Sequence, residues 1–304
     1  MNITFLGTAA GTPSKYRNVT STALDLMKER KSIWLFDCGE GTQRQFMQVP
    51  LNPNKIEKIF ITHLHGDHLY GLMPLISSLS LLQHTAPLTI YGPEGIRQYV
   101  ETCIKITQPF ITYPLEIIEI TEGLIFEDER WSMHAYSLAH RVPCFGFRIQ
   151  EKDRTGPLLK KKLEAAGIPV GSVYQQIKRG QDVLLADGRQ IKSRDFLGDP
   201  IKGRIVAIFG DTRPTDNELL IAQNADIVVH EATVSAQKEN WALEFGHCTT
   251  AHAALMAKNA QAKRLLLTHI SNRYNLSDEA RLLEEARAIF PATEIAHDFE
   301  TFEV

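Results

Sequence analysis

The chain has 304 residues, of which 43% are hydrophobic and 23% are charged. This composition is typical of globular proteins and argues against long intrinsic disorder or fibrous repeats. A chain of this length forms one large α/β domain or two smaller ones. The formal net charge is −3, and taken alone it argues against a nucleic-acid partner, because nucleic-acid-binding domains usually carry a basic excess.

Cysteine usage and hydropathy indicate the compartment. The four cysteines lie far apart and form no CxxC pair, which favours a reducing cytoplasm over a disulfide framework. The first seven residues read as a strand without a cationic region, so we expect no signal peptide. The longest apolar stretch, residues 72–82, is too short to span a bilayer. The sequence therefore predicts a cytoplasmic protein with no membrane segment.

Short apolar runs alternate with helical patterns along most of the chain. The runs predict strands over residues 2–7, 20–27, 33–37, 58–62, 88–91, 115–120, 131–138, 144–150, 204–209, 226–229 and 264–268. The helical patterns cover residues 93–107, 250–259 and 277–289. Ser277 is the expected N-cap of the last helix, since acidic residues follow it in the first turn. Together the patterns predict layered sheets flanked by helices.

One segment differs in charge from the rest. Residues 151–204 hold twelve basic and seven acidic residues, a net +5, whereas the other 250 residues sum to −8. The segment also contains several glycines and little continuous apolar pattern. We interpret it as a segment that protrudes from the core and is not one of its layers. The overall charge of −3 therefore averages a basic segment with an acidic body, and the objection to a nucleic-acid partner no longer holds.

The sequence HLHGDH at residues 63–68 follows the strand predicted over 58–62. Three imidazoles and a carboxylate within six residues are rare in a solvated turn or a core. They are ligand types of Zn²⁺ and related first-row ions. His63 and His65 can point the same way while Asp67 and His68 reach a second position, so the motif predicts a site for two metals.

Three further ligand-type residues follow predicted strands, namely His140, Asp211 and His269. Asp211 is a plausible bridging ligand because two carboxylate oxygens can serve two cations. A single histidine after a strand is more often structural than a ligand, so spacing alone does not assign His140 or His269.

The order HxHxDH, His, Asp, His resembles the ligand series of the metallo-β-lactamase superfamily across nearly the whole chain. The resemblance implies a mixed α/β (α+β) fold, a four-layer αββα sandwich, forming one domain over residues 1–304 with metals along one edge. It implies two zinc ions per chain, with Mn²⁺ or Fe²⁺ possible on the same donors. One zinc would be held by His63, His65 and His140 and the other by Asp67, His68 and His269, with Asp211 between them.

Further motifs resemble the ribonuclease Z family in its short bacterial form. They are PSKYRN at 13–18, HEAT at 230–233, HCT at 247–249, where the family usually has HST, and THISNRY at 268–274. The basic segment lies where that family has a protruding tRNA-binding arm, over approximately residues 151–200. The resemblance implies a homodimeric endoribonuclease that removes the 3′ trailer from precursor tRNA by attack of a metal-bridging water. It would leave a 3′-hydroxyl on the tRNA and a 5′-phosphate on the trailer.

The resemblance also suggests roles for single residues. Asp67 would accept a proton from the attacking water as well as bind metal. His247, oriented by Glu231, would protonate the leaving 3′-oxygen. The alternative for His247 is a capping residue before the helix that starts near residue 250. His230 could support the site or simply belong to the core.

Four residues are candidates for substrate binding. Lys15, Arg17 and Arg273 could bind phosphates, and Tyr274 could stack on a base. The alternative for each is a solvated surface side chain or a structural aromatic.

Other functions stay open on the sequence alone. The principal alternative is a broader metal-dependent ribonuclease or phosphodiesterase with exonuclease activity. The basic segment and the motif at 13–18 argue against a thioester or lactam hydrolase, and the complete ligand series argues against a non-catalytic RNA-binding protein. There is no GxSxG elbow or P-loop. The glycines at 39 and 41 are interpreted as shaping a loop that supports the metal site.

Overall fold

The computed structural model describes residues 1–304, which divide into two compact units. The first unit comprises Met1–Glu127, Met133–Ile149 and Ile205–Val304. The second comprises Asp128–Ser132 and Gln150–Arg204, and so includes the predicted basic segment.

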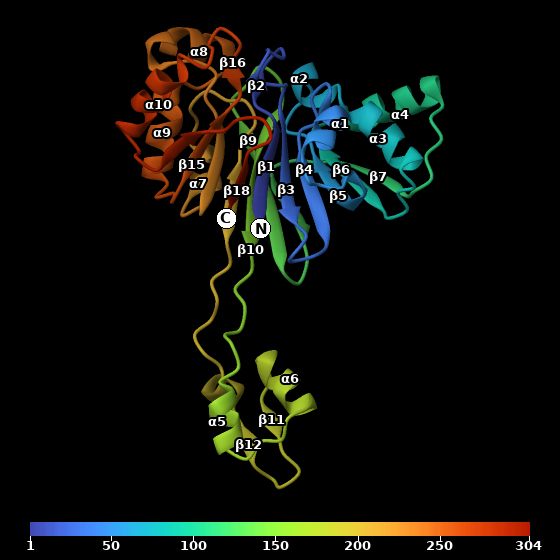
Figure 1. The fold of residues 1–304 in the computed structure, drawn as a ribbon, viewed down its shortest axis with the longest axis vertical. Coiled ribbons are helices and arrows are strands. Elements are labelled where there is room, and N and C mark those ends of the chain that lie inside the picture. The colour runs from blue at the N-terminus through green and yellow to red at the C-terminus, as the bar shows by residue number, and fades with distance from the viewer. The chain divides into compact units, whose positions relative to one another are not determined.

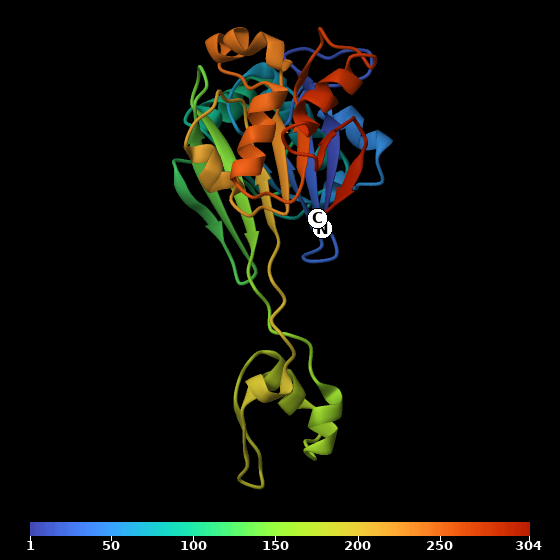
Figure 2. The same ribbon diagram turned by 90° about the vertical axis from the view of Figure 1, so that its left-hand side faces the viewer.

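The first of two seven-stranded sheets contains most of the strands predicted in the N-terminal half. In spatial order its strands are β18 (Thr301–Glu303), β1 (Asn2–Gly7), β3 (Ser21–Leu26), β4 (Ser32–Phe36), β5 (Ile56–Phe60), β6 (Leu88–Gly92) and β7 (Leu115–Glu119). The strands from β4 to β7 run parallel, while β1 runs antiparallel to both its neighbours. Asn2 pairs with Glu303, so the two termini lie side by side (Figure 2).

The second seven-stranded sheet contains the later strands. In spatial order these are β17 (Thr293–Ile295), β15 (Leu265–Thr268), β14 (Ile227–Glu231), β13 (Ile205–Ile208), β10 (Cys144–Glu151), β9 (Trp131–Leu138) and β8 (Gly123–Glu127). The strands β13, β14, β15 and β17 are parallel. A short pair, β2 (Ala9–Ala10) with β16 (Ile270–Ser271), joins the N-terminal loop to the chain after β15.

Aromatic side chains fill the space between the two sheets. Phe147 of β10 packs against Phe36 and Phe60 of the first sheet, with ring centroids 5.7 Å apart in both cases. Phe36 and Phe60 stack on each other at 5.0 Å. All three rings are buried. Each such pair contributes about 0.5–1.5 kcal/mol beyond its buried area, so the rings help to fix the two sheets face to face.

Helices cover the outer faces of the sheets (Figure 1). On the first sheet they are α1 (Thr42–Gln45), α2 (Gly66–Leu69), α3 (Leu72–Leu81) and α4 (Ile96–Thr107), with 3₁₀ turns at Phe46–Gln48 and Pro53–Lys55. On the second they are α7 (Asn217–Ala222), α9 (Thr250–Asn259) and α10 (Glu279–Arg287), while α8 (Glu239–Phe245) and a 3₁₀ turn at Ala236–Lys238 lie beyond the strand ends at the top of Figure 1. Each outer helix layer shares a buried apolar cluster with its sheet. The predicted four-layer αββα order is confirmed.

The helix boundaries confirm one sequence expectation and correct another. Helix α9 begins after Thr249, whose side chain accepts a hydrogen bond from the backbone of His252. Ser277 is not the N-cap of α10, because Asp278 occupies that position. The Ser277 hydroxyl instead donates to Asn275 at 2.6 Å, closing a local turn before the helix.

The second unit has a small core of its own. Its elements are α5 (Lys160–Ala165), α6 (Ser172–Lys178), β11 (Val183–Leu184), β12 (Gln190–Ile191) and a 3₁₀ turn at Ser193–Phe196. Leu163, Ile177 and Val183 belong to one buried apolar cluster within it. The buried Glu151 pairs with Arg130 at 2.7 Å and with Arg204 at 2.8 Å.

No helix in the chain combines the length and hydrophobicity that a membrane-spanning segment requires. All four cysteines are free.

Candidate metal centre and catalytic site

The candidate site residues gather where parallel strands of both sheets end. Asp37 follows β4, Asp211 comes shortly after β13, and His269 follows β15. The carboxyl ends of parallel strands meet at one edge of a sheet, which is why residues far apart in sequence converge here. Asp37 and His269 both have a left-handed backbone, with φ of 57° and 56°. This conformation is costly for residues other than glycine and turns each side chain into the site.

His63, His65 and His140 form one group of inward-facing nitrogens. Nδ1 of His65 lies 3.1 Å from Nε2 of His63 and 3.2 Å from Nε2 of His140. Burial and the neighbouring imidazoles lower the pKa of His63 well below its usual value. Low pKa values favour neutral imidazoles, the form that binds a metal ion.

Asp67, His68 and His269 form the second group. Nε2 of His269 lies 3.3 Å from Nε2 of His68 and 3.3 Å from Oδ2 of Asp67. The backbone amide of Gly11 donates to the same Asp67 oxygen at 2.7 Å and so orients this carboxylate.

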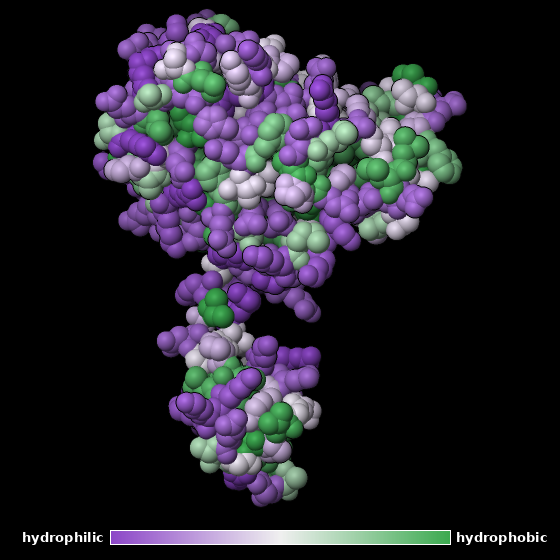
Figure 3. Space-filling model, in the orientation of Figure 1, coloured by the Kyte–Doolittle hydropathy of each residue, from purple (hydrophilic) through white to green (hydrophobic).

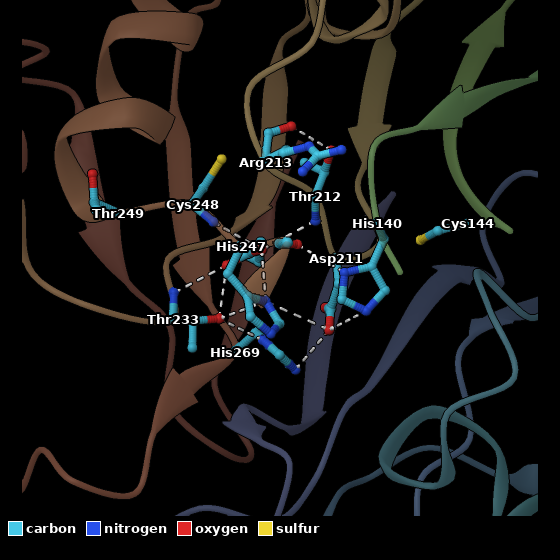
Figure 4. Close-up of polar contacts among 12 residues, drawn as sticks. His140, Cys144, Asp211, Thr212, Arg213, Thr233, His247, Cys248, Thr249 and His269 are labelled. Carbon is cyan, nitrogen blue, oxygen red and sulfur yellow. Dashed lines mark hydrogen bonds and ion pairs between the residues drawn. The ribbon is translucent and has the colours of Figure 1, made fainter. Parts of the chain in front are cut away.

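Asp211 lies between the two groups. Its Oδ2 is 3.7 Å from Nε2 of His63 and 3.4 Å from Nε2 of His269, and its Oδ1 is 3.5 Å from Nε2 of His68. Figure 4 shows His140, His247 and His269 around this carboxylate. Burial opposes its ionisation, but the imidazoles of His269 and His68 outweigh burial and hold the pKa of Asp211 well below its usual range.

This donor set fits two first-row cations. Imidazole nitrogens and carboxylate oxygens converge on two positions with one carboxylate between them, which is the chemistry that zinc, manganese and iron accept. The structure brings together all seven residues that the sequence proposed as ligands.

Buried oxygen atoms contact the ring nitrogens of the ligand histidines that point away from the site, and so orient these rings. Oδ2 of Asp37 lies 2.7 Å from Nδ1 of His68 and accepts a hydrogen bond from the Thr62 hydroxyl at 2.9 Å. The Thr62 oxygen can then accept Nδ1–H of His63 at 3.0 Å. A histidine whose Nδ1–H is held in this way presents Nε2 as the metal-binding lone pair.

A second hydroxyl has the same arrangement on the other side of the site. The Thr233 hydroxyl donates to Oε2 of Glu231 at 2.7 Å and lies 2.9 Å from Nδ1 of His269. Nδ1 of His140 lies 2.7 Å from the carbonyl oxygen of Gly246. Four of the five histidines in the proposed ligand set are therefore oriented by a neighbouring oxygen, a pattern that sequence spacing does not reveal.

His247 and Glu231 form a partly buried pair beside the ligand groups. Nδ1 of His247 lies 3.0 Å from Oε1 of Glu231. That oxygen also accepts the backbone amides of Thr212 and Cys248. Burial opposes protonation of His247, but the charge and hydrogen bond of Glu231 outweigh it and raise the pKa of His247 to about 9. His247 does not cap α9, since Thr249 does.

A cavity of about 310 Å³ opens onto the ligand groups. It is lined by His65, Asp67, His140, Asp211, His247 and His269, together with Gly11, Arg141, Thr233, Trp241 and Phe245 among others. Sequence reasoning missed Arg141, Trp241 and Phe245. Trp241 and Phe245 stand four residues apart between the motifs at 230–233 and 247–249. This spacing is the one feature of the sequence that could have indicated two aromatic rings on one helix face near the site.

The structure corrects the expected role of Arg17. Its guanidinium is buried, donates to Thr8 at 2.7 Å and to the carbonyl oxygen of Ala296 at 2.6 Å, and pairs with Glu279. A guanidinium with these partners holds the N-terminal loop to the C-terminal region and does not face a substrate phosphate. Lys15, in contrast, is exposed.

Tyr274 is partly buried and contacts other segments of the chain. Its hydroxyl accepts the Ser235 amide at 3.0 Å, and its ring packs against the apolar cluster of the second sheet. Its neighbour Arg273 is exposed and lies over the ring of Trp241 at 4.4 Å. Trp241 and Phe245 are thus the aromatic side chains that line the cavity.

His230 belongs to the core. It precedes Glu231 in β14, and successive strand residues point to opposite faces, so it faces away from the site. Its Nε2 lies 2.9 Å from Glu218, and its ring contacts Phe209.

Comparison with known proteins decides the family. The chain is 51% identical over 304 residues to the ribonuclease Z of Geobacillus kaustophilus (strain HTA426), covering 100% of this chain and 99% of that protein. The chain belongs to the ribonuclease Z family. It is also 51% identical over 302 residues to the ribonuclease BN of Erwinia tasmaniensis, covering 99% of each. Family membership confirms the predicted enzyme class, a ribonuclease.

Solved structures confirm the fold. The human tRNase Z short form has a TM-score of 0.72 and 29% identity, covering 100% of this chain and 99% of that one. The metallo-β-lactamase fold protein YhfI of Bacillus subtilis has a TM-score of 0.70 at 19% identity, which supports the fold alone. Residues 1–105 also match the family model described as anti-Pycsar protein Apyc1, a match too short to decide the family.

Proposed function

We propose that this chain is a zinc-dependent endoribonuclease that removes the 3′ trailer from precursor tRNA. The observation that carries the proposal is the juxtaposition of two ligand groups sharing Asp211 with the His247–Glu231 pair in one cavity. Relatives named ribonuclease Z and tRNase Z support the same activity.

His63, His65 and His140 would hold one zinc ion and Asp67, His68 and His269 the other, with Asp211 shared between them. Two bound cations would acidify the attacking water and neutralise charge on the phosphodiester. Manganese or iron would be accepted by the same donors.

The remaining steps belong to side chains of the chain itself. Asp67, ionised and oriented by the Gly11 amide, accepts the proton of the attacking water. His247 holds a proton for the leaving 3′-oxygen, because Glu231 accepts the hydrogen at Nδ1 and leaves Nε2 as the donor. The products are a tRNA with a 3′-hydroxyl and a trailer with a 5′-phosphate.

The second unit supplies the basic surface for tRNA, as the segment 151–200 was expected to do. Its exposed cations include Lys160, Lys161, Lys178 and Arg179. Phosphate contacts of this kind provide affinity without reading sequence. Lys15 and Arg273, both exposed, bind phosphates near the acceptor end.

An exposed apolar surface on the first unit supports a homodimer. Met47, Leu81, Ile106 and Phe110 are between 74% and 84% exposed, and Leu82 is 50% exposed. Hydrophobic side chains gather over the α3–α4 side of the molecule (Figure 3). Patches of this kind mark protein interfaces. Light scattering on a column eluate tests the proposal, and a monomer at micromolar concentration would refute it.

An experiment with blocked and free ends separates the endonuclease from its principal alternative. A precursor tRNA whose trailer ends in a 3′-phosphate is compared with the same precursor ending in a free 3′-hydroxyl. We expect both to be cut at equal rates into two fragments. Stepwise shortening of the free-ended precursor alone would instead establish the broader ribonuclease with exonuclease activity.

A further inference from the structure

Helix α8 places two aromatic rings at the cavity. Trp241 and Phe245 stand four residues apart and therefore share one helix face. Both are only partly buried, and both line the cavity that contains the ligand groups. Neither belongs to the apolar cluster that the second sheet shares with α7, α9 and α10. Packing in the protein core therefore does not explain why two aromatic residues stand at these positions.

The two rings form the centre of a stack with two guanidinium groups. The rings lie 4.8 Å apart, with planes inclined by 22°. The Arg273 guanidinium lies 4.4 Å from the Trp241 ring, and the Arg141 guanidinium lies 4.5 Å from the Phe245 ring. Aromatic rings and guanidinium planes are both surfaces on which unpaired bases stack, and the cations add attraction for phosphate.

The stack is adjacent to the proposed proton donor. The Trp241 ring is parallel to the His247 imidazole within 6°, at a centroid distance of 6.2 Å. Nε of Arg273 is held by the Ser271 hydroxyl at 3.1 Å. A base held on this surface would therefore belong to a nucleotide next to the bond that is cut.

We infer that Trp241 and Phe245, flanked by Arg273 and Arg141, form a stacking surface for one unpaired nucleobase beside the scissile phosphodiester. The inference rests on the proposed function and specifies its ligand as an unpaired nucleotide at the end of the acceptor stem. The surface would favour single-stranded ends over duplex ones, since a base within a duplex is already stacked on its neighbours.

Intrinsic fluorescence provides a direct test, because Trp34 and Trp131 are fully buried and Trp241 alone reaches the cavity. The metal-loaded protein is titrated with a mature tRNA that ends in its unpaired discriminator base, and with the same tRNA lacking that base. We expect quenching by the first tRNA and little by the second. Equal quenching by both, or none by either at saturation, would overturn the inference.

A double-mutant cycle gives the energetic test. Binding of the discriminator-ended tRNA and of its abasic counterpart is measured with the wild type and with Trp241→Ala. Stacking on an aromatic side chain predicts that Trp241→Ala raises Kd about 5- to 150-fold for the intact tRNA and has little further effect on the abasic one. If the affinity lost through Trp241→Ala and the affinity lost through removal of the base simply add in the double change, the contact between them is refuted.

Two controls keep the result interpretable. Trp241→Phe should retain most of the affinity, and Leu124→Ala, at an exposed apolar residue outside the cavity and outside the proposed dimer surface, should bind like the wild type. If Trp241→Ala fails to fold, Trp241→Leu replaces it in the cycle. Failure of the proposed function would appear separately, as a wild type that binds tRNA but does not cleave the precursor.

Discussion

Nδ1 of His247 lies 3.0 Å from Oε1 of Glu231, and this ion pair controls the protonation of the proposed leaving-group acid. Glu231 is itself fixed by the amides of Thr212, Thr233 and Cys248. A buried carboxylate with this many donors stays ionised and keeps a positive charge on its partner.

Replacing Glu231 with glutamine should therefore move the alkaline limb of the pH–rate profile. The wild-type pKa of His247 is raised to about 9, so the acid is protonated below that value and activity falls as pH rises through it. Without the carboxylate charge the pKa drops, and activity is lost at lower pH. Steady-state cleavage rates between pH 6 and 10 measure the shift. An alkaline limb at the same pH in Glu231→Gln and in the wild type would exclude His247 as the acid.

The Thr233 hydroxyl should contribute to metal affinity. Thr233→Val removes the acceptor for Nδ1–H of His269, while Thr233→Ser retains it. Loss of such a partner typically lowers metal affinity by about 10- to 100-fold. Competition with a chromophoric chelator measures this without an activity assay. Equal affinities for the valine and serine variants would show that the hydroxyl does not orient the ligand.

Arg17 and Lys15 provide a matched pair for separating structure from binding. Arg17→Ala leaves Glu279 with His297 as its remaining partner and removes the donor to Thr8 and to the Ala296 carbonyl, so it should cost about 1–3 kcal/mol of unfolding free energy. Lys15→Ala should leave stability within about 0.5 kcal/mol and weaken tRNA binding. Urea denaturation and tRNA binding are measured on both variants. A stable Arg17→Ala variant that binds tRNA poorly would instead support the expectation that Arg17 binds a phosphate of the substrate.

Removal of residues 155–195 tests the role of the second unit. The deletion preserves the paired backbone bonds between Arg154 and Ile201, both 2.9 Å long. We expect hydrolysis of small phosphodiesters to continue and KM for tRNA to rise by about tenfold or more, because phosphate contacts are lost. Unchanged tRNA cleavage by the shortened protein would show that this unit does not bind the substrate.

Much of the site could be predicted because its ligands obey local rules. Four of the seven proposed ligands lie within residues 63–68, and Asp211 and His269 both follow apolar strands. Parallel strands then bring these ends together at a shared edge. The strands of the first sheet were predicted for the same reason, since their apolar runs are short and well separated.

Contacts between distant segments could not be predicted. The motif at residues 13–18 shows two cations, but only the folded chain shows that Arg17 meets Glu279 while Lys15 remains exposed. The orienting roles of Thr62 and Thr233 depend on hydroxyl geometry, which spacing does not encode. The core of the second unit was not predicted, because its buried residues, such as Leu163 and Ile177, are widely spaced and form no continuous apolar pattern.

Mapping both product ends of a cleaved precursor tRNA is the most direct test of the central claim. The metal-loaded wild type and the His68→Ala variant are each incubated with a 3′-extended precursor. The account predicts a single cut after the discriminator base by the wild type, with a 3′-hydroxyl on the tRNA and a 5′-phosphate on the trailer, and no cut by His68→Ala. Cleavage at scattered positions, a 3′-phosphate on the tRNA, or an active His68→Ala variant would contradict it.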